Sequence, residues 1–143
     1  MKRTITTIFA AVIMITSASA IAASLVNPLK DVKTVKIVQT YLEAATIGNT
    51  EFNRYLFTDD FQFTNCAAQK TFSKSEYLKH LNTTKNLRLN CKTSYEILDE
   101  SGQACVAKVT MTFDNFSRVD YITLNHGEKG WKISKVVSTY PEN

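Results

Sequence analysis

The sequence predicts an α+β fold in which helices lie across one face of a strongly curved, mainly antiparallel sheet, and two patterns support this prediction. Between residues 29 and 48, apolar side chains recur at the spacing of an amphipathic helix. From residue 87 to residue 137, apolar and polar side chains alternate instead, as in strands with one wet face. Helices first and a run of strands afterwards are typical of α+β domains. With 143 residues, 44% of them hydrophobic, the chain supplies one core.

The start of the chain predicts a secretory signal peptide. Lys2 and Arg3 give it a positive start, residues 8–15 form a compact apolar run, and small residues follow. We expect cleavage after Ala20 or Ala23, which places the protein in the periplasm or outside the cell. An uncleaved anchor is the alternative, although a span normally needs about 20 strongly apolar residues. We therefore expect no stable membrane span after cleavage.

Residues 1–23 are then the leader, and residues 24–143 form a single domain. The formal net charge of the whole chain is +4, and losing Lys2 and Arg3 reduces it to +2. A mildly basic mature protein argues against nucleic acid as a partner. One local excess of positive charge could attract an anionic ligand or surface. It comprises Lys70, Lys74, Lys79, Lys85, Arg88 and Lys92.

The first half of the domain predicts three helices and a strand pair. Pro28 suits the first turn of the helix over residues 29–48, and Gly48-Asn49 ends it. Thr50 can cap a short helix over residues 51–56. Short strands are expected over residues 61–64 and 70–72. The pattern Ser73-x-x-Glu76 is a capping box and predicts the start of a third helix.

Three turn sequences divide the alternating region into a four-stranded meander. The turns are Glu100-Ser101-Gly102, Asn115-Phe116 and Gly127-Glu128. Closing the chain at these turns pairs Ile97 with Cys105, Met111 with Asp120, and Asp120 with Lys135. Apolar residues then face one another along one side of the sheet. Asp120 and Lys135 are the exception, and the register makes them partners.

Three cysteines in an exported chain allow at most one disulfide within it. The predicted register separates Cys91 from Cys105 by six residues along the strands, on the order of 20 Å, which is too far for a bond. Pairing of Cys66 with either of them stays open. Three small, buried thiols are the interpretation that we favour.

The motifs resemble those of a known superfamily. Residues 41–63 resemble the opening of the nuclear transport factor 2-like (NTF2-like, SnoaL-like) superfamily. Asp120-Tyr-Ile-Thr-Leu and Gly130-Trp-Lys-Ile are similar to the end of its putative lumazine-binding family. The resemblance covers essentially all of the mature chain. It implies a cone whose helices and concave sheet enclose a pocket, often in a homodimer that packs through the outer side of the sheet.

The resemblance does not imply one activity, because the superfamily contains isomerases, cyclases, dehydratases and hydrolases beside members that only bind or assemble. An enzyme of this kind needs a carboxylate and a partner acid around one pocket. Asp120 with Tyr41 or Tyr55 could supply them. However, Lys135 opposite Asp120 would favour the ionised carboxylate and make it a poor general base. The pair could instead fix the register of the last two strands.

We therefore predict an exported, non-enzymatic domain that binds a small polar or aromatic ligand or serves as a dimeric interaction module. The alternative is a small isomerase, dehydratase or cyclase that uses Asp120 as its catalytic residue with a pocket tyrosine. His80 and His126 are expected at the surface, and we expect neither a metal site nor a cofactor. The predicted pocket is lined by Tyr41, Phe61, Phe63, Tyr95, Met111, Asp120, Ile122, Ile133 and Lys135.

Overall fold

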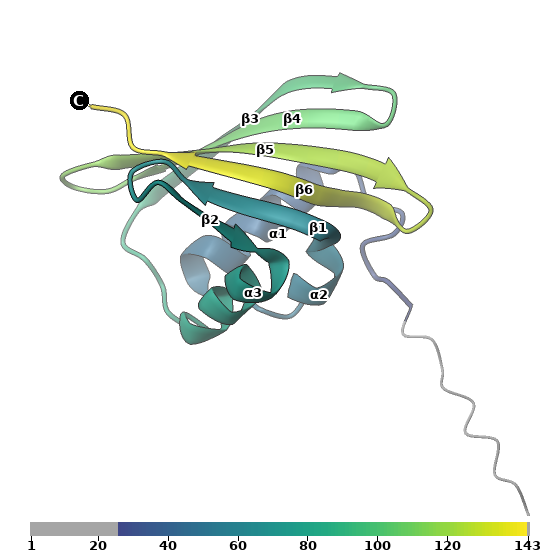
Figure 1. Cartoon of the computed structure of the whole chain (residues 1–143), viewed down its shortest axis with the longest axis horizontal. Helices are drawn as coiled ribbons and strands as arrows, with labels where there is room; N and C mark the ends of the chain where they lie inside the picture. The colour runs from purple at the N-terminus through teal and green to yellow at the C-terminus, as the bar shows by residue number, and fades with distance from the viewer. Residues whose placement is uncertain (1–25, 143) are drawn as a thin grey trace, which may run out of the picture.

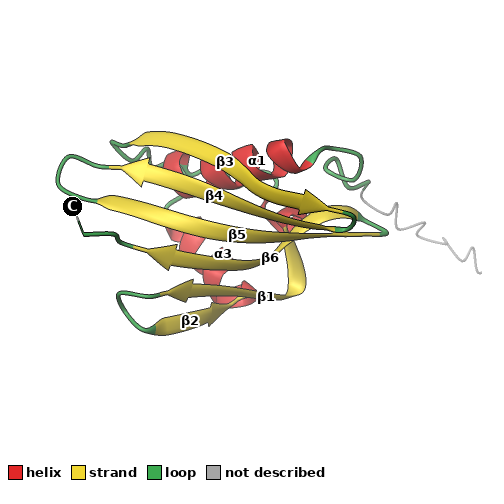
Figure 2. Cartoon of the chain, turned by 90° about the horizontal axis from the view of Figure 1, so that it is seen from above, coloured by secondary structure: helices red, strands yellow, loops and turns green. Residues whose placement is uncertain are grey.

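The computed structural model describes residues 26–142, in which three helices pack on one face of a six-stranded sheet (Figure 1). The expected signal peptide lies outside these residues. Figure 2 shows the strands as one curved layer with the helices behind it. The predicted α+β architecture is confirmed.

Helix α1, Thr34–Ile47, begins five residues later than the sequence predicted. Residues 28–31 form a turn instead, and the Asn27 side chain accepts a hydrogen bond from the backbone N–H of Leu29 at 2.9 Å. The predicted end is confirmed, because Gly48 adopts the left-handed conformation with φ 66°. The buried face of α1 carries Ile37, Val38 and Tyr41, as its helical spacing requires.

The predicted order of the next elements is confirmed. Helix α2 covers Asn53–Leu56, strand β1 Phe57–Asn65, strand β2 Lys70–Ser73 and helix α3 Lys74–Thr83. The capping box at the start of α3 is present: the Ser73 N–H donates to the Glu76 carboxylate at 2.8 Å, and Ser73 Oγ accepts from the Glu76 N–H at 3.4 Å.

The meander consists of β3 (Lys92–Ser101), β4 (Ala104–Thr112), β5 (Ser117–Gly127) and β6 (Gly130–Thr139). Residues 87–91, which the pattern assigned to the first strand, form a loop. The sheet order is β2-β1-β6-β5-β4-β3, so the N-terminal hairpin extends the meander into one sheet. Strand β1 runs parallel to β6, and the other neighbours are antiparallel.

The predicted registers of the first two meander hairpins are wrong by two residues. Ile97 lies opposite Ala107 rather than Cys105, and Met111 lies opposite Arg118 rather than Asp120. The turns close at Gly102-Gln103 and over residues 113–116. Because side chains alternate with period two, a shift of two residues keeps every side chain on its predicted face. The continuous apolar face therefore survives the error.

The predicted pairing of Asp120 with Lys135 is wrong for two reasons: the last hairpin is also shifted by two residues, and a β-bulge interrupts it. Leu124 lies opposite Ile133, but Thr123 lies opposite Lys135, so Ser134 is an extra residue in β6. One extra residue moves the following side chains to the other face. Lys135 is consequently exposed on the solvent side, and Asp120 lies opposite Ser138.

Candidate functional site

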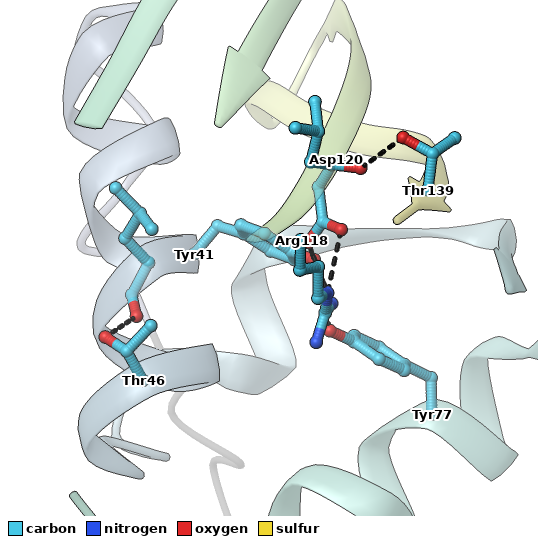
Figure 3. A network of polar contacts seen from close by, with 8 residues as sticks. Tyr41, Thr46, Tyr77, Arg118, Asp120 and Thr139 are labelled. Carbon is cyan, nitrogen blue, oxygen red and sulfur yellow. Dashed lines mark hydrogen bonds and ion pairs between the residues drawn. The ribbon is translucent and has the colours of Figure 1, made fainter. Parts of the chain in front are cut away.

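A buried ion pair on β5 organises the candidate site (Figure 3). Asp120 is 0% exposed, and two nitrogens of the Arg118 guanidinium contact it. Arg118 Nε donates to Asp120 Oδ1 at 2.9 Å and Nη2 donates to Oδ2 at 2.8 Å. The two residues are neighbours because positions i and i+2 of a strand share a face. This bidentate geometry fixes the plane of the guanidinium.

Two tyrosines from separate helices extend the network. Tyr41 of α1 donates its hydroxyl hydrogen to Asp120 Oδ2 at 2.7 Å, and Tyr77 of α3 donates to the Tyr41 hydroxyl at 3.3 Å. Arg118 Nη2 also approaches the Tyr41 hydroxyl at 3.5 Å. The chain of contacts thus links α1, α3 and β5 through one carboxylate.

Burial and the ion pair shift the titration of these groups. Burial raises the pKa of Tyr41 well above its usual value, and the nearby Asp120 raises it further. Burial also raises the pKa of Tyr77, although Arg118 opposes that shift. For Arg118, burial alone would lower the pKa, but interactions with Tyr41 and Asp120 outweigh it and raise the pKa. Both phenols are therefore neutral, and the guanidinium is charged, at physiological pH.

A cavity of about 260 Å³ is lined by Arg118 but not by Asp120. It forms where the C-terminal ends of β1 and β6 meet β2 and helix α3. We call it the Arg118 pocket. It is lined by Phe63, Asn65, Phe72, Tyr77, His80, Arg118 and Tyr140.

Aromatic rings hold the walls of the Arg118 pocket in place. Phe63 and Tyr77 stack with ring centroids 4.5 Å apart and an interplanar angle of 12°. Phe63 also packs against Phe72 at 6.2 Å, and the Arg118 guanidinium lies 5.5 Å from the centroid of the Phe63 ring. In the described part of the chain, the hydrogen bonds of Arg118 use Nε and Nη2.

Of the nine residues that the sequence assigned to a pocket, only Phe63 lines this cavity. Tyr41 and Asp120 lie behind Arg118 in the polar network. Tyr95 lies far away on the edge strand, 41% exposed, where its hydroxyl accepts a hydrogen bond from Gln39. Lys135 faces solvent. The remaining four belong to the buried core, namely Phe61, Met111, Ile122 and Ile133.

The geometry of Asp120 does not suit a general base. Its carboxylate accepts three hydrogen bonds from Arg118 and Tyr41 and has no exposed surface. A base must come within hydrogen-bond reach of the substrate proton. Arg118 lines the cavity and Asp120 does not, so a ligand in the Arg118 pocket meets the arginine.

Sequence reasoning missed most of the residues that line the Arg118 pocket. Arg118 could have been found, because it shares a strand face with Asp120 and is the nearest cation to it along that face. His80 is exposed, as the sequence predicted, and it also lines the cavity, because it follows Tyr77 by three positions on α3 and so lies on the same helix face. Tyr140 gave no signal, since it follows the last strand and the alternating pattern does not include it.

The cysteines are free thiols, but only Cys105 is buried. Cys66 is exposed and Cys91 is half-buried, so the expectation of three buried thiols is wrong for these two. Within residues 26–142, no group of three or more His, Cys, Asp or Glu side chains is arranged to hold a metal ion. No helix in that range is long and apolar enough to cross a membrane.

Comparison with known proteins agrees with the architecture. A family model described as "Putative lumazine-binding" matches residues 30–140. No protein among the curated ones matches the chain. An NTF2-like protein of unknown function from Silicibacter pomeroyi DSS-3 has a similar structure, with a TM-score of 0.63 and 15% identity over 75% of this chain and 92% of that chain.

Two further solved structures are similar to the same extent. An NTF2-like protein from Cytophaga hutchinsonii ATCC 33406 has a TM-score of 0.62 and 19% identity, covering 75% of this chain and 94% of that one. Another, of unknown function, from Methylobacillus flagellatus KT has a TM-score of 0.62 and 18% identity, covering 79% of this chain and 98% of that one. At these identities the likeness shows the fold alone, and it confirms the NTF2-like prediction.

Proposed function

The chain belongs to the putative lumazine-binding family and has an NTF2-like fold, and we propose that it binds a small, planar, polar or anionic molecule in the Arg118 pocket without transforming it. Lumazine, the bicyclic heteroaromatic compound in the family's description, is the first candidate of this class. Its carbonyl groups accept hydrogen bonds and its rings present flat faces.

The position of the Arg118 guanidinium is the main support for this proposal. Asp120 holds it with two hydrogen bonds of 2.8 and 2.9 Å, and Arg118 also lines the cavity. An arginine fixed in this way is preorganised, so little side-chain entropy is lost when it binds a carbonyl or carboxylate group. Asn65 and His80 add polar atoms to the same cavity.

The size and walls of the Arg118 pocket narrow the ligand class. Its volume of about 260 Å³ lies below the roughly 300–1,000 Å³ typical of pockets for drug-sized ligands. Four of its seven lining residues are aromatic, and rings favour flat partners. A small heteroaromatic or aromatic acid meets both requirements.

The position of Asp120 supports a role without catalysis. The carboxylate is saturated with hydrogen bonds and shielded by Arg118, and both nearby tyrosines are held in the neutral form. An isomerase, dehydratase or cyclase that uses Asp120 with a tyrosine would need one of these groups to exchange a proton with a substrate.

Isothermal titration with lumazine and with benzoate tests the proposal. We expect saturable binding of at least one of them with one site per chain. The Tyr140→Ala variant removes an aromatic wall and should weaken binding about 2–10-fold. Arg118→Gln removes a charged donor and should weaken it roughly 10-fold or more.

The control is Tyr121→Ala, which removes an exposed tyrosine from the other face of the sheet. It should leave the affinity unchanged. Circular dichroism of each variant separates loss of binding from loss of folding, which matters for Arg118→Gln because it leaves Asp120 without its partner. No binding of either compound to the folded wild-type protein would contradict the proposal, as would equal weakening by Tyr121→Ala.

We also propose that the protein is exported and that a signal peptide is removed by cleavage after Ala20 or Ala23. The basic start and the short apolar run support this proposal. Cell fractionation followed by intact mass measurement tests it. We expect a periplasmic or secreted species that begins at Ile21 or Ser24, and a full-length cytoplasmic species would contradict it.

We also propose that two copies of the chain form a dimer through the outer side of the sheet. Such a dimer would also fit a role as an interaction module. Tyr121 is 40% exposed on this face, next to the partly buried Val137 on the neighbouring strand. Analytical ultracentrifugation should show a dimer that Tyr121→Glu dissociates. A monomer at all concentrations would contradict this part and leave the Arg118 pocket unaffected.

A further inference from the structure

A second concave site lies at the other end of β6. Five positively charged side chains from separate segments surround a pocket of about 560 Å³, which we call the basic pocket. Its cations come from the N-terminal turn, α2, α3, the β5–β6 hairpin and β6. They are Lys30, Arg54, Lys74, Lys129 and Lys132.

The basic pocket is separate from the Arg118 pocket. Lys132 stands near the start of β6 and Tyr140 follows its end, so the strand holds them roughly 25 Å apart at the usual rise per residue. Figure 1 shows the β5–β6 hairpin beside the start of the described chain, at the opposite end of the sheet from the C-terminus. The two pockets share no lining residue.

The charge of the basic pocket is poorly balanced. Asp59 and Glu128 are its two acidic lining residues. The one ion pair there, within the described residues, joins Lys74 Nζ to Asp59 Oδ1 at 3.3 Å, and the Asp59 side chain is fully exposed. The other four cations therefore have no carboxylate partner within 4 Å in the described chain. Only Lys74 belongs to the basic run that the sequence singled out.

The neighbouring positive charges affect the pKa of Lys132. Burial lowers the pKa of its ammonium group, and the neighbouring Lys74 and Lys129 lower it further. An anion placed among these side chains would offset the repulsion between the ammonium groups.

The scaffold of the basic pocket is fixed by backbone contacts. The Asn27 side-chain amide donates to the Lys129 carbonyl at 2.9 Å. Gly130 has φ 89°, and a Cβ there would lie 2.2 Å from the Lys30 carbonyl oxygen, so the hairpin packs directly on the N-terminal turn. Lys30 and Lys129 thus project from two segments that are held together.

We propose that the basic pocket binds a phosphate group. Lysine ammonium groups and the fork of Arg54 are the usual partners of phosphate oxygens, and the pocket gathers five of them around one space. Tyr55 and Val26 add apolar surface at the same place for the organic part of a ligand. The phosphate can come from a small soluble phosphorylated molecule or from a lipid headgroup.

Two probes distinguish these sources. Inorganic pyrophosphate, followed by ¹⁵N–¹H NMR of the residue 24–143 protein at low ionic strength, should shift the signals of residues 129–132 saturably. Vesicles of phosphatidylglycerol and phosphatidylcholine should be sedimented with bound protein only if the lipid headgroup is the source. Binding to pyrophosphate but not to the vesicles assigns the site to a soluble ligand. Binding to the vesicles assigns it to a lipid headgroup. Either result supports a phosphate site.

The variants Lys129→Gln and Lys132→Gln should each weaken binding roughly 10-fold, as expected for loss of one charged contact. Lys135→Gln makes the same charge change on the exposed face of β6 and should alter the affinity less than about twofold. Failure to bind either probe would overturn the proposal. Equal weakening by Lys135→Gln would also overturn it, since it would show attraction to net charge alone. Arg118→Gln should leave this binding intact, so the two sites can fail separately.

Discussion

At the scale of single residues, the ion pair of Asp120 with Arg118 is the feature on which the account depends. The Asp120→Asn variant keeps the shape but leaves a mostly buried guanidinium without a counter-charge, since the Arg118 side chain is only 18% exposed. We expect a loss of about 3 kcal/mol in the free energy of unfolding. Urea denaturation measures it.

Asp59→Asn is the matched control for this variant. It makes the same chemical change in an ion pair whose carboxylate is fully exposed. We expect no measurable change in the denaturation midpoint. If both variants behaved alike, the Asp120 ion pair would not stabilise the fold.

Because the phenols of Tyr41 and Tyr77 are buried, we expect the protein to lose stability at high pH. Their pKa values are raised in the folded protein, chiefly by burial, so folding favours the neutral phenols. The stabilisation is complete below the pKa of an unfolded tyrosine, about 10, and is lost as the pH rises above it. Thermal melting between pH 8 and pH 11.5 should show a falling midpoint above pH 10.

The Tyr41→Phe variant checks the cause of that fall. It removes one of the raised phenols, so the decline in melting temperature above pH 10 should become shallower. Tyr95→Phe changes an exposed tyrosine and should leave the slope as it is. An unchanged slope in Tyr41→Phe would contradict the assignment.

The sequence could predict part of the site at this scale. Period two places Asp120 on the buried face, and its burial is confirmed. Its partner was predicted wrongly, because the bulge at Ser134 is not encoded by alternation and moves Lys135 to solvent. Arg118 was available on the same face, at two positions from Asp120.

At the scale of elements, the hairpin between β5 and β6 depends on Gly130. Its positive φ is strained for other residues, and a Cβ would contact the Lys30 carbonyl oxygen. We expect Gly130→Ala to lower the free energy of unfolding by about 2 kcal/mol or more. Gly127→Ala is the control, since a Cβ there meets nothing within 4 Å. Calorimetric melting compares them, and equal midpoints would contradict the packing of the hairpin on the N-terminal turn.

The sequence predicted those element boundaries that depend on interactions between residues close together in the chain. The capping box of Ser73 with Glu76 and the glycine that ends α1 were both readable from sequence and are present. The start of α1 and the hairpin registers were not, because they depend on contacts between distant segments. Asn27 illustrates this, since its side chain both orders the N-terminal turn and binds the Lys129 carbonyl.

At the scale of the whole molecule, the order of helices and strands was sufficient to predict the architecture. It could not show that β1 pairs in parallel with β6 and joins all six strands into one sheet. That pairing brings Phe63 and Asn65 beside the end of β6, next to Tyr140. The Arg118 pocket is therefore a product of topology, which explains why alternation within the meander placed the pocket too close to the core.

Side-chain NMR of Arg118 during titration with lumazine tests directly whether the Arg118 pocket binds this ligand. We expect a saturable shift of the Arg118 guanidinium and His80 imidazole signals, with those of Lys132 unchanged. A titration that leaves Arg118 and His80 unaffected while lumazine shifts signals elsewhere would contradict this expectation.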